Sequence, residues 1–210
     1  MDRWATFDCY GTLIDWNGGI GRELERLFGV GSVATLLHRY HEVEPEVQRE
    51  EPTRSYREVM AITLARLGTP PDEQDSLGRS LPSWEPFPEV RGALDEVRER
   101  GWKLAILSNT DRDFIDASME RIGVPFELAI VASEIGSYKP AHGHWRAFRE
   151  RITSDAHIHV GASLFHDVAP AHDLGLRTVL VNRLGEQAGP QPDVELRSLD
   201  GLGDALDALA

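Results

Sequence analysis

The chain has 210 residues, 41% hydrophobic and 27% charged, so it is long enough to bury the core of an ordinary globular protein. Its 22 basic and 35 acidic residues give a formal charge of −13, which argues against a broad basic face for nucleic acid. The single cysteine, Cys9, excludes an internal disulfide, and no apolar run has the length of a signal peptide or of a membrane span, so we expect a cytoplasmic protein.

The first predicted element is a short strand, Trp4–Phe7, which ends at Asp8 and runs into the turn Cys9–Thr12. From about residue 14 to residue 86 the apolar positions recur with the helical period, and glycines and prolines separate the helical stretches. We therefore predict a helical insert after the first strand. The stretch Pro82–Pro88 is rich in proline and marks the return of the chain from this insert.

Beyond the insert, short apolar runs alternate with helical stretches. The strands predicted there are Lys103–Leu107, Leu128–Val131, Ile158–Val160 and Thr178–Val181. The helices predicted between and after them span residues 111–122, 141–152 and 169–174. This alternation predicts an α/β fold with a Rossmann-like parallel sheet covered by helices on both faces. The predicted core comprises residues 1–13 and 87–210, and the predicted helical cap domain comprises residues 14–86.

Polar residues stand beyond the end of each of several predicted strands, before or within the helix that follows. They are Asp8, Ser108 with Asn109, Lys139, and Ser163 followed by Asp167. Because the carboxyl ends of parallel strands meet at one edge of a sheet, we expect these side chains to converge. Each residue alone also has a plainer interpretation, as a turn former, a helix cap or a solvated lysine. Their occurrence at successive strand ends, with the insert where a lid would sit, favours a catalytic site.

The motifs at these positions together resemble those of the haloacid dehalogenase superfamily. They are D-x-Y-G-T-L beginning at Asp8, L-S-N ending at Asn109, Y-K-P around Lys139 and S-x-x-x-D ending at Asp167. The resemblance extends over the whole chain and implies that Asp8 attacks the substrate and forms an aspartyl ester, which water later hydrolyses. A carboxylate gains as a nucleophile when it is positioned and partly desolvated, so the implied role agrees with physical chemistry.

The resemblance also implies roles for the other motif residues. Ser108 is expected to hold the substrate anion, and the adjacent helix N-terminus is a suitable seat for that charge. Lys139 is expected to balance the negative charge of Asp8 and of the substrate, which keeps the carboxylate ionised. Asp167 is the acid of the last motif.

The residue two positions after the nucleophile divides this superfamily by reaction. Its phosphatases carry an aspartate there as a general acid, whereas this chain carries Tyr10, whose ordinary pKa of about 10 suits that task poorly. A halide leaves without a proton. The resemblance is therefore to the branch that cleaves the carbon–halogen bond of short (S)-2-haloacids and needs no cofactor.

In this interpretation the substrate carboxylate lies against Ser108, Asn109 and the turn Tyr10–Gly11, while Thr12 and Lys139 support Asp8. The expected partner is therefore a small anionic substrate, with no nucleic acid and no membrane, bound by a monomer or a homodimer. The sequence does not determine which halogen or which chain length the site accepts.

Two alternatives stay open at this point. The first is a Mg²⁺-dependent phosphatase of a small metabolite, with the metal held by Asp8, the Tyr10 carbonyl and Asp167, since such oxygen ligands suit a hard cation. The second is a non-catalytic relative that uses the cleft for binding. Tyr10 favours the dehalogenase over the phosphatase, and the complete set of motif residues disfavours the binding protein.

Several positions depart from the pattern of the dehalogenases. Arg39 stands near the place expected for the arginine that binds the halide, but it is equally interpretable as an exposed helix residue. Ala162 and Leu164 replace a serine and an asparagine that, in the dehalogenases, help to place the hydrolytic water. Ser163 and His166 are expected in the substrate pocket, where His166 either activates water or packs at a helix start.

Overall fold

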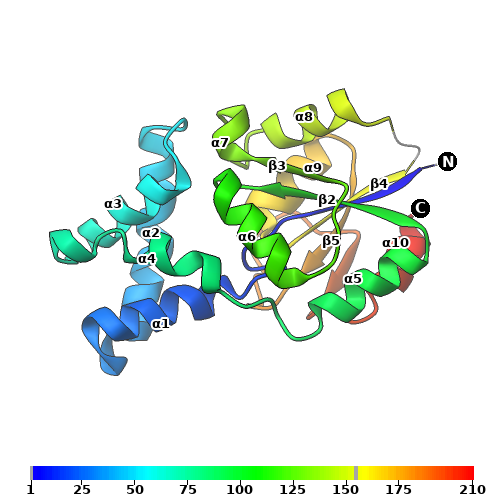
Figure 1. Cartoon of the computed structure of the whole chain (residues 1–210). Helices are drawn as coiled ribbons and strands as arrows, with labels where there is room; N and C mark the ends of the chain where they lie inside the picture. The colour runs from blue at the N-terminus through cyan, green and yellow to red at the C-terminus, as the bar shows by residue number, and fades with distance from the viewer. Residues whose placement is uncertain (1, 154–155) are drawn as a thin grey trace.

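The computed structural model describes residues 2–153 and 156–210, in which six parallel strands form one twisted sheet in the order β3-β2-β1-β4-β5-β6 (Figure 1). The strands are β1 (Arg3–Phe7), β2 (Trp102–Ser108), β3 (Leu128–Val131), β4 (Ala156–Gly161), β5 (Arg177–Val181) and β6 (Val194–Leu196). The order reverses at β1, which lies between β2 and β4. Ligands of open parallel sheets bind at such a switch point, beyond the carboxyl ends of the strands.

Helices cover both faces of the sheet because successive strand side chains point to opposite faces. On one face, Phe7 and Ile106 pack in a large cluster with the buried residues of three helices. These helices are α5 (Val90–Glu99), α6 (Arg112–Ile122) and α10 (Leu202–Leu209). On the other face, Trp4 and Leu107 pack with Trp145 and other residues of the helices that follow β3 and β4. These helices are α7 (Ala132–Ile135), α8 (Gly143–Arg151) and α9 (Ala169–Asp173).

The helices of the insert lie beside the carboxyl ends of the strands, at the left of Figure 1. These helices are α1 (Trp16–Phe28), α2 (Val33–Glu50), α3 (Tyr56–Arg66) and the short α4 (Ser76–Ser80). Three 3-10 turns, Val30–Ser32, Pro71–Glu73 and Leu81–Ser83, complete the insert. Asp15 caps α1 by accepting a hydrogen bond from the Gly18 amide, and Ser55 with Glu58 forms a capping box on α3.

The two chain segments that connect the insert to the core run side by side. The Asp15 amide donates to the Glu85 carbonyl at 3.0 Å, and the Phe87 amide donates to the Leu13 carbonyl at 3.0 Å. This pairing brings the entry and the exit of the insert to one narrow connection. The division into a core and a cap domain at residues 14 and 86 stays a prediction.

The predicted fold class and the five predicted strands are confirmed, with boundaries within two residues of those expected. Outside the insert, four elements were not predicted: α7, β6, α10 and a π-helical turn at Leu164–Val168 that precedes α9. β6 has only three residues and lies at the sheet edge, so its sequence carries too few positions for a periodic signal. No helix among the described residues has both the length and the apolar character needed to cross a bilayer.

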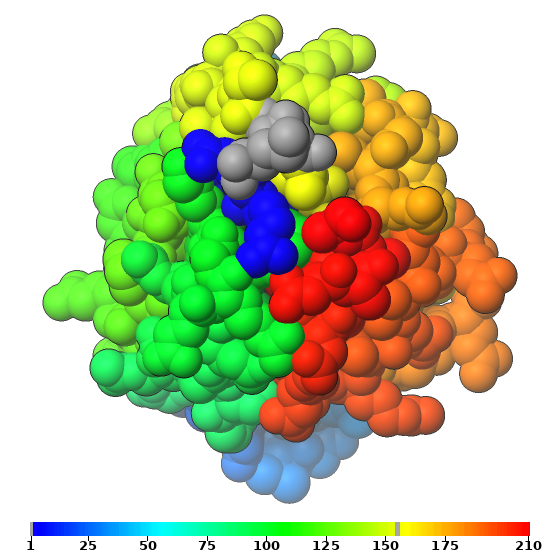
Figure 2. All heavy atoms as spheres, turned by 90° about the vertical axis from the view of Figure 1, so that its right-hand side faces the viewer, coloured from blue at the N-terminus to red at the C-terminus, as the bar shows by residue number. Residues whose placement is uncertain are grey.

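The opposite end of the core, seen in Figure 2, is closed by α10, whose surface lies against that of α5 and the start of the chain. Asp207 accepts hydrogen bonds from Arg3 at 2.7 Å and from Arg100 at 2.9 Å. The last helix is therefore attached to β1 and α5 far from the carboxyl ends of the strands. It stabilises the sheet and does not contribute to the site described next.

Candidate active site

Asp8 lies one residue beyond β1, where the chain turns sharply toward the insert. Its amide donates to the Val160 carbonyl at 2.9 Å, which prolongs the pairing of β1 with β4. The turn returns through Gly11, whose φ of +92° is a conformation that other residues rarely adopt. Thr12 Oγ1 then donates to Asp8 Oδ2 at 2.8 Å, so the turn itself fixes one oxygen of the carboxylate.

Lys139 joins the two buried carboxylates of the site. Its Nζ donates to Asp8 Oδ1 at 2.8 Å and to Asp167 Oδ1 at 2.6 Å, and the side chain is about 1% exposed. Burial acts to lower the pKa of Lys139, but the two carboxylates outweigh it and raise the pKa. The ammonium is therefore charged at neutral pH and neutralises part of the carboxylate charge.

The two carboxylates respond to the same surroundings in opposite ways. Burial raises the pKa of Asp8, and Lys139 opposes this rise only in part. For Asp167, the attraction of Lys139 and the hydrogen bond from His159 outweigh burial and lower the pKa. Asp167 is thus the permanently ionised partner of Lys139, while Asp8 is the more basic of the two carboxylates.

Asp167 is held by three further features of the core. The Ser163 amide donates to Oδ2 at 3.1 Å, and His159 Nε2 lies 3.3 Å from Oδ1. Thr6 Oγ1 lies 3.0 Å from His159 Nδ1, so a chain of polar groups inside the sheet orients the imidazole. Gly161 is required beside them, because a Cβ there would lie 2.3 Å from the Asp167 carboxyl carbon. His159 was not predicted as a site residue; the available signal was its position two residues before Gly161 on the same strand, which puts both residues on one face of the sheet.

Ser108 and Asn109 lie at the end of β2, before α6. The Asn109 side chain forms two hydrogen bonds with the backbone of Lys139, at 2.6 Å to its amide and 3.0 Å to its carbonyl, and so joins the second and third motifs. The Ser108 hydroxyl is buried and has no hydrogen-bond partner among the described residues, although it lines the pocket. A buried hydroxyl without a partner is costly, so this group is suited to bind a ligand.

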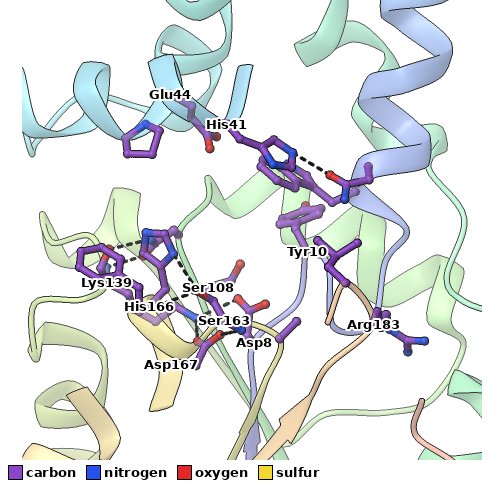
Figure 3. A pocket seen from close by; sticks show the side chains of 18 of the residues that line it. Asp8, Tyr10, His41, Glu44, Ser108, Lys139, Ser163, His166, Asp167 and Arg183 are labelled. Carbon is purple, nitrogen blue, oxygen red and sulfur yellow. Dashed lines mark hydrogen bonds and ion pairs between the residues drawn. The ribbon is translucent and has the colours of Figure 1, made fainter. Parts of the chain in front are cut away.

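A cavity of about 540 Å³ lies between the core and the insert, and Asp8 is in its wall. The site residues expected from the sequence that line it are Asp8, Tyr10, Gly11, Ser108, Asn109, Lys139, Ser163, His166 and Asp167. Thr12 supports Asp8 from behind the wall. Figure 3 shows Asp8, Ser108, Lys139 and Asp167 on the core side of this cavity, and Glu44 and His41 on the side of the insert.

Arg39 does not line the cavity, which corrects its expected place in the substrate pocket. Its side chain is 61% exposed and its guanidinium pairs with Glu42 at 2.9 Å. The physical reason is the helical period of α2: its buried residues are Tyr40, Val43, Glu44 and Val47, and Arg39 is not among them. Arg39 is therefore a solvated residue of the insert.

The side chain of Tyr10 packs among aromatic residues and leaves no acid beside Asp8. Its ring stacks on Tyr56 and meets Trp84 edge to face, and its hydroxyl lies 3.0 Å from Ser118 Oγ on α6. Burial raises the pKa of Tyr10 well above its ordinary value. The hydroxyl is thus engaged and a poor proton donor at neutral pH.

The last motif places His166 in the cavity wall with Ser163. His166 Nδ1 lies 3.3 Å from Ser163 Oγ, and burial lowers the pKa of His166 to about 4. The imidazole is consequently neutral near pH 7. Ala162 lines the cavity as well, so the position of one expected hydroxyl is apolar.

We call two groups of cavity residues the core wall and the cap wall. The core wall comprises Asp8, Ser108, Asn109, Lys139 and Asp167. The cap wall comprises Trp16, Asn17, His41, Glu44 and Gln48. None of the cap-wall residues was predicted as a site residue. Arg183 was not predicted either; it lines the cavity but pairs with Glu89 at 2.6 Å.

Of the groups expected to hold Mg²⁺ under the phosphatase alternative, the two carboxylates already share a cation of the protein itself. The oxygens of Asp8 and Asp167 that face each other are both bound by the Lys139 ammonium, which supplies the cation between them. Across the described residues, no cluster of three or more histidine, cysteine, aspartate or glutamate side chains is arranged to hold a metal ion. The donor set thus fits a lysine-neutralised carboxylate pair.

Comparison with known proteins finds likeness over most of the chain. The model of the haloacid dehalogenase-like hydrolase family matches residues 3–175. The (S)-2-haloacid dehalogenase of Pseudomonas sp. (strain YL) is 29% identical over 219 aligned residues, covering 97% of this chain and 94% of that protein. A ribulose-1,5-bisphosphate 5-phosphatase of Halopiger xanaduensis is 28% identical, but covers 59% of this chain and 56% of that protein.

Among solved structures, the L-2-haloacid dehalogenase from Xanthobacter autotrophicus with chloropropionic acid covalently bound has a TM-score of 0.84. The sequence identity is 22%, and the match covers 100% of both chains. This likeness shows that the two chains share one fold.

Proposed function

We propose that this chain, which belongs to the haloacid dehalogenase-like hydrolase family, cleaves the carbon–halogen bond of short 2-haloacids through a covalent ester of Asp8. The observation that carries the proposal is that the position two residues after Asp8 carries no carboxylic acid. Asp8 is paired with Lys139 at 2.8 Å, while Tyr10, two residues on, offers no acidic proton. The likeness to an (S)-2-haloacid dehalogenase over 97% of the chain supports the same reaction.

In the first step a carboxylate oxygen of Asp8 attacks C2 of the substrate. The new C–O bond forms as the carbon–halogen bond breaks, and its electron pair leaves with the halide, so the configuration at C2 inverts. Thr12 and Lys139 hold the two oxygens of Asp8 at 2.8 Å each and limit their rotation. Such positioning replaces much of the entropy that a free carboxylate would lose in reaching the transition state.

The substrate carboxylate is assigned to Ser108 and the turn at Tyr10–Gly11. The Ser108 hydroxyl has no partner within the described part of the protein, so a carboxylate there satisfies it. The Asn109 side chain is occupied by the backbone of Lys139, and its role is to hold the second and third motifs together. Charge-assisted hydrogen bonds of this kind contribute about 1.5–3 kcal/mol each.

In the second step water attacks the carboxyl carbon of the Asp8 ester. The acyl C–O bond breaks, one proton of the water goes to the departing hydroxyacid oxygen, and the second proton is released. Asp167 stays ionised and keeps Lys139 beside Asp8 while the ester carries no charge. The proposed reaction uses no metal and no organic cofactor.

The experiment that tests the proposal is a single turnover of (S)-2-bromopropionate in water enriched in oxygen-18. We expect bromide release and one heavy oxygen in the peptide that contains Asp8, while the (R)-lactate formed stays light. Heavy oxygen in the lactate under single-turnover conditions would contradict the ester. Asp8→Asn is the control and should release no bromide.

A phosphatase is the second candidate, because one relative of known activity is a phosphatase. The discriminating measurement is phosphate release from a panel of small phosphate esters, with Mg²⁺ and with a chelator. We expect no phosphate release above the rate measured for the Asp8→Asn variant. Chelator-sensitive phosphate release that exceeds bromide release would replace the dehalogenase proposal by this second candidate.

A further inference from the structure

The cap wall contains a carboxyl group that the proposed reaction does not use. Glu44 lies on the buried face of α2, together with Tyr40, Val43 and Val47, and is only 7% exposed. A carboxyl on the buried face of an amphipathic helix breaks the pattern that the rest of that helix follows. Such exceptions are expected at functional sites.

Glu44 is also without a counter-charge. Its Oε1 is buried and has no hydrogen-bond partner among the described residues, and no ion pair to it is found there. An ionised carboxylate is too costly to bury in this way, so the group is favoured as the neutral acid. Burial accordingly raises the pKa of Glu44 to about 7.

This acid shares a cavity with the nucleophile. Glu44 and Asp8 both line the cavity of about 540 Å³, and Figure 3 shows Glu44 on the cap side, across from Asp8 and Lys139. Asp8 and Glu44 therefore belong to opposite walls of the space that is open to a substrate. The expected halide ligand, Arg39, is outside the cavity, so the cap wall offers the leaving group a neutral acid in its place.

We propose that Glu44 donates a proton to the departing halide and that the substrates that need this donor are 2-fluoroacids. The inference rests on the proposed function, since it assigns the leaving-group side of that reaction. Fluoride is the poorest leaving group among the halides and the strongest hydrogen-bond acceptor. Bromide and chloride depart as anions without help, so only the fluoro substrates depend on an acid.

The atoms and charges balance over the two steps. Asp8 attacks C2, the C–F bond breaks with its electron pair going to fluorine, and the Glu44 proton goes to the same fluorine. Hydrogen fluoride leaves and Glu44 becomes a carboxylate. The water that hydrolyses the Asp8 ester gives one proton to the hydroxyacid and the other to Glu44, which restores the acid.

The pH dependence follows from which form of Glu44 is active. The acid form is present below its pKa and is lost as the pH rises through about 7. The titratable groups that face Glu44 are Tyr40 and His41 from α2, Tyr56 from α3, Tyr138 after α7 and, across the cavity, Asp8, Lys139, His166 and Asp167. The pKa of Tyr40 and of Tyr56 lies well above 10, and burial lowers that of His41 below its ordinary value, so the pKa of each of these three cap groups is shifted away from that of Glu44.

The test compares fluoroacetate with bromoacetate in wild type, Glu44→Gln and the matched control Glu42→Gln. Glu42 is on the same helix, but it is exposed and pairs with Arg39. For Glu44→Gln we expect kcat for fluoroacetate to fall at least about 100-fold, the usual size of a general-acid effect, and kcat for bromoacetate to change less than about threefold. Glu42→Gln should match wild type with both substrates.

The ratio of the two rates in wild type gives a test that needs no variant. The fluoroacetate-to-bromoacetate ratio should fall as the pH rises from 6 to 9, and this fall should be absent in Glu44→Gln. Equal losses for both substrates in Glu44→Gln, a ratio that does not change with pH, or turnover of bromoacetate alone would each overturn the role of Glu44. If the wild-type protein did not turn over bromoacetate at all, the proposed function itself would be overturned.

Discussion

The core wall and the cap wall of the cavity differ in how their charges are neutralised. In the core wall each charged side chain has an opposite charge within 2.8 Å: Lys139 lies between Asp8 and Asp167. In the cap wall Glu44 is buried with no counter-charge among the described residues, and its neighbours Trp16, Asn17 and Gln48 are neutral.

This difference separates two tasks. The paired charges of the core wall fix the position of Asp8, and they are held by four motifs that follow strands of the sheet. The cap wall comes from the helical insert and, in the proposed reaction, faces the part of the substrate that leaves. We infer that the core wall sets the type of reaction and that the cap wall sets which leaving group is accepted.

The largest effect is expected when the paired charge of the core wall is broken. Lys139→Met keeps the apolar stem but leaves two buried carboxylates without their shared cation. We expect kcat to fall by about 10³-fold and the free energy of unfolding to fall by about 3–5 kcal/mol. Halide release and urea unfolding measure the two effects. Lys103→Met, which removes an exposed ion pair with Asp2, is the control; a Lys139→Met enzyme within tenfold of wild type would contradict this account.

The buried carboxyl group of the cap wall should make the free energy of unfolding depend on pH. The folded pKa of Glu44, about 7, lies above its ordinary 4.5, so the wild-type protein loses stability as the pH rises through this interval. Glu44→Gln cannot ionise, and we expect it to be more stable than wild type by about 3 kcal/mol at pH 8 and by much less at pH 4.5. Urea unfolding at the two pH values measures the difference. If Glu44→Gln were more stable than wild type by the same amount at both pH values, Glu44 would not be held as the neutral acid.

The Ser108 hydroxyl of the core wall should contribute to substrate binding and very little to the free energy of unfolding. Ser108→Ala removes a hydroxyl that has no partner in the described structure, so we expect the free energy of unfolding to change by less than about 0.5 kcal/mol. We expect kcat/KM to fall by about 10–100-fold, the value of one hydrogen bond to a carboxylate. Ser118→Ala is the control, because that hydroxyl bonds Tyr10 instead. A large loss of stability with unchanged kcat/KM would reverse the assignment.

The smallest effect is expected at Arg39, which lies outside both walls of the cavity. Arg39→Ala removes an exposed pair with Glu42, and such pairs contribute about 0–1 kcal/mol. We expect kcat, KM and product inhibition by bromide to stay within about twofold of wild type. A loss of bromide inhibition of tenfold or more would return Arg39 to the cavity and remove the contrast between the walls.

The core wall was predictable from the sequence because its residues follow strands. Asp8, Ser108, Lys139 and Asp167 each come after an apolar run, and parallel topology brings the ends of such runs together. The cap wall was not predictable in the same way. Arg39 and Glu44 are five residues apart on one helix, and only the rotation of α2 against the core decides which of them faces the cavity.

By itself, the sequence determined the α/β class and predicted the place of the insert and the position of Asp8 after the first strand, because hydrophobic periodicity and turn residues are local properties of the chain. The tertiary structure alone decided that His159 supports Asp167, that Tyr10 turns its hydroxyl to Ser118 and that Glu44 replaces Arg39 at the cavity. These outcomes depend on contacts between residues distant in the chain, whose geometry is set by how helices and strands pack and not by their own sequences.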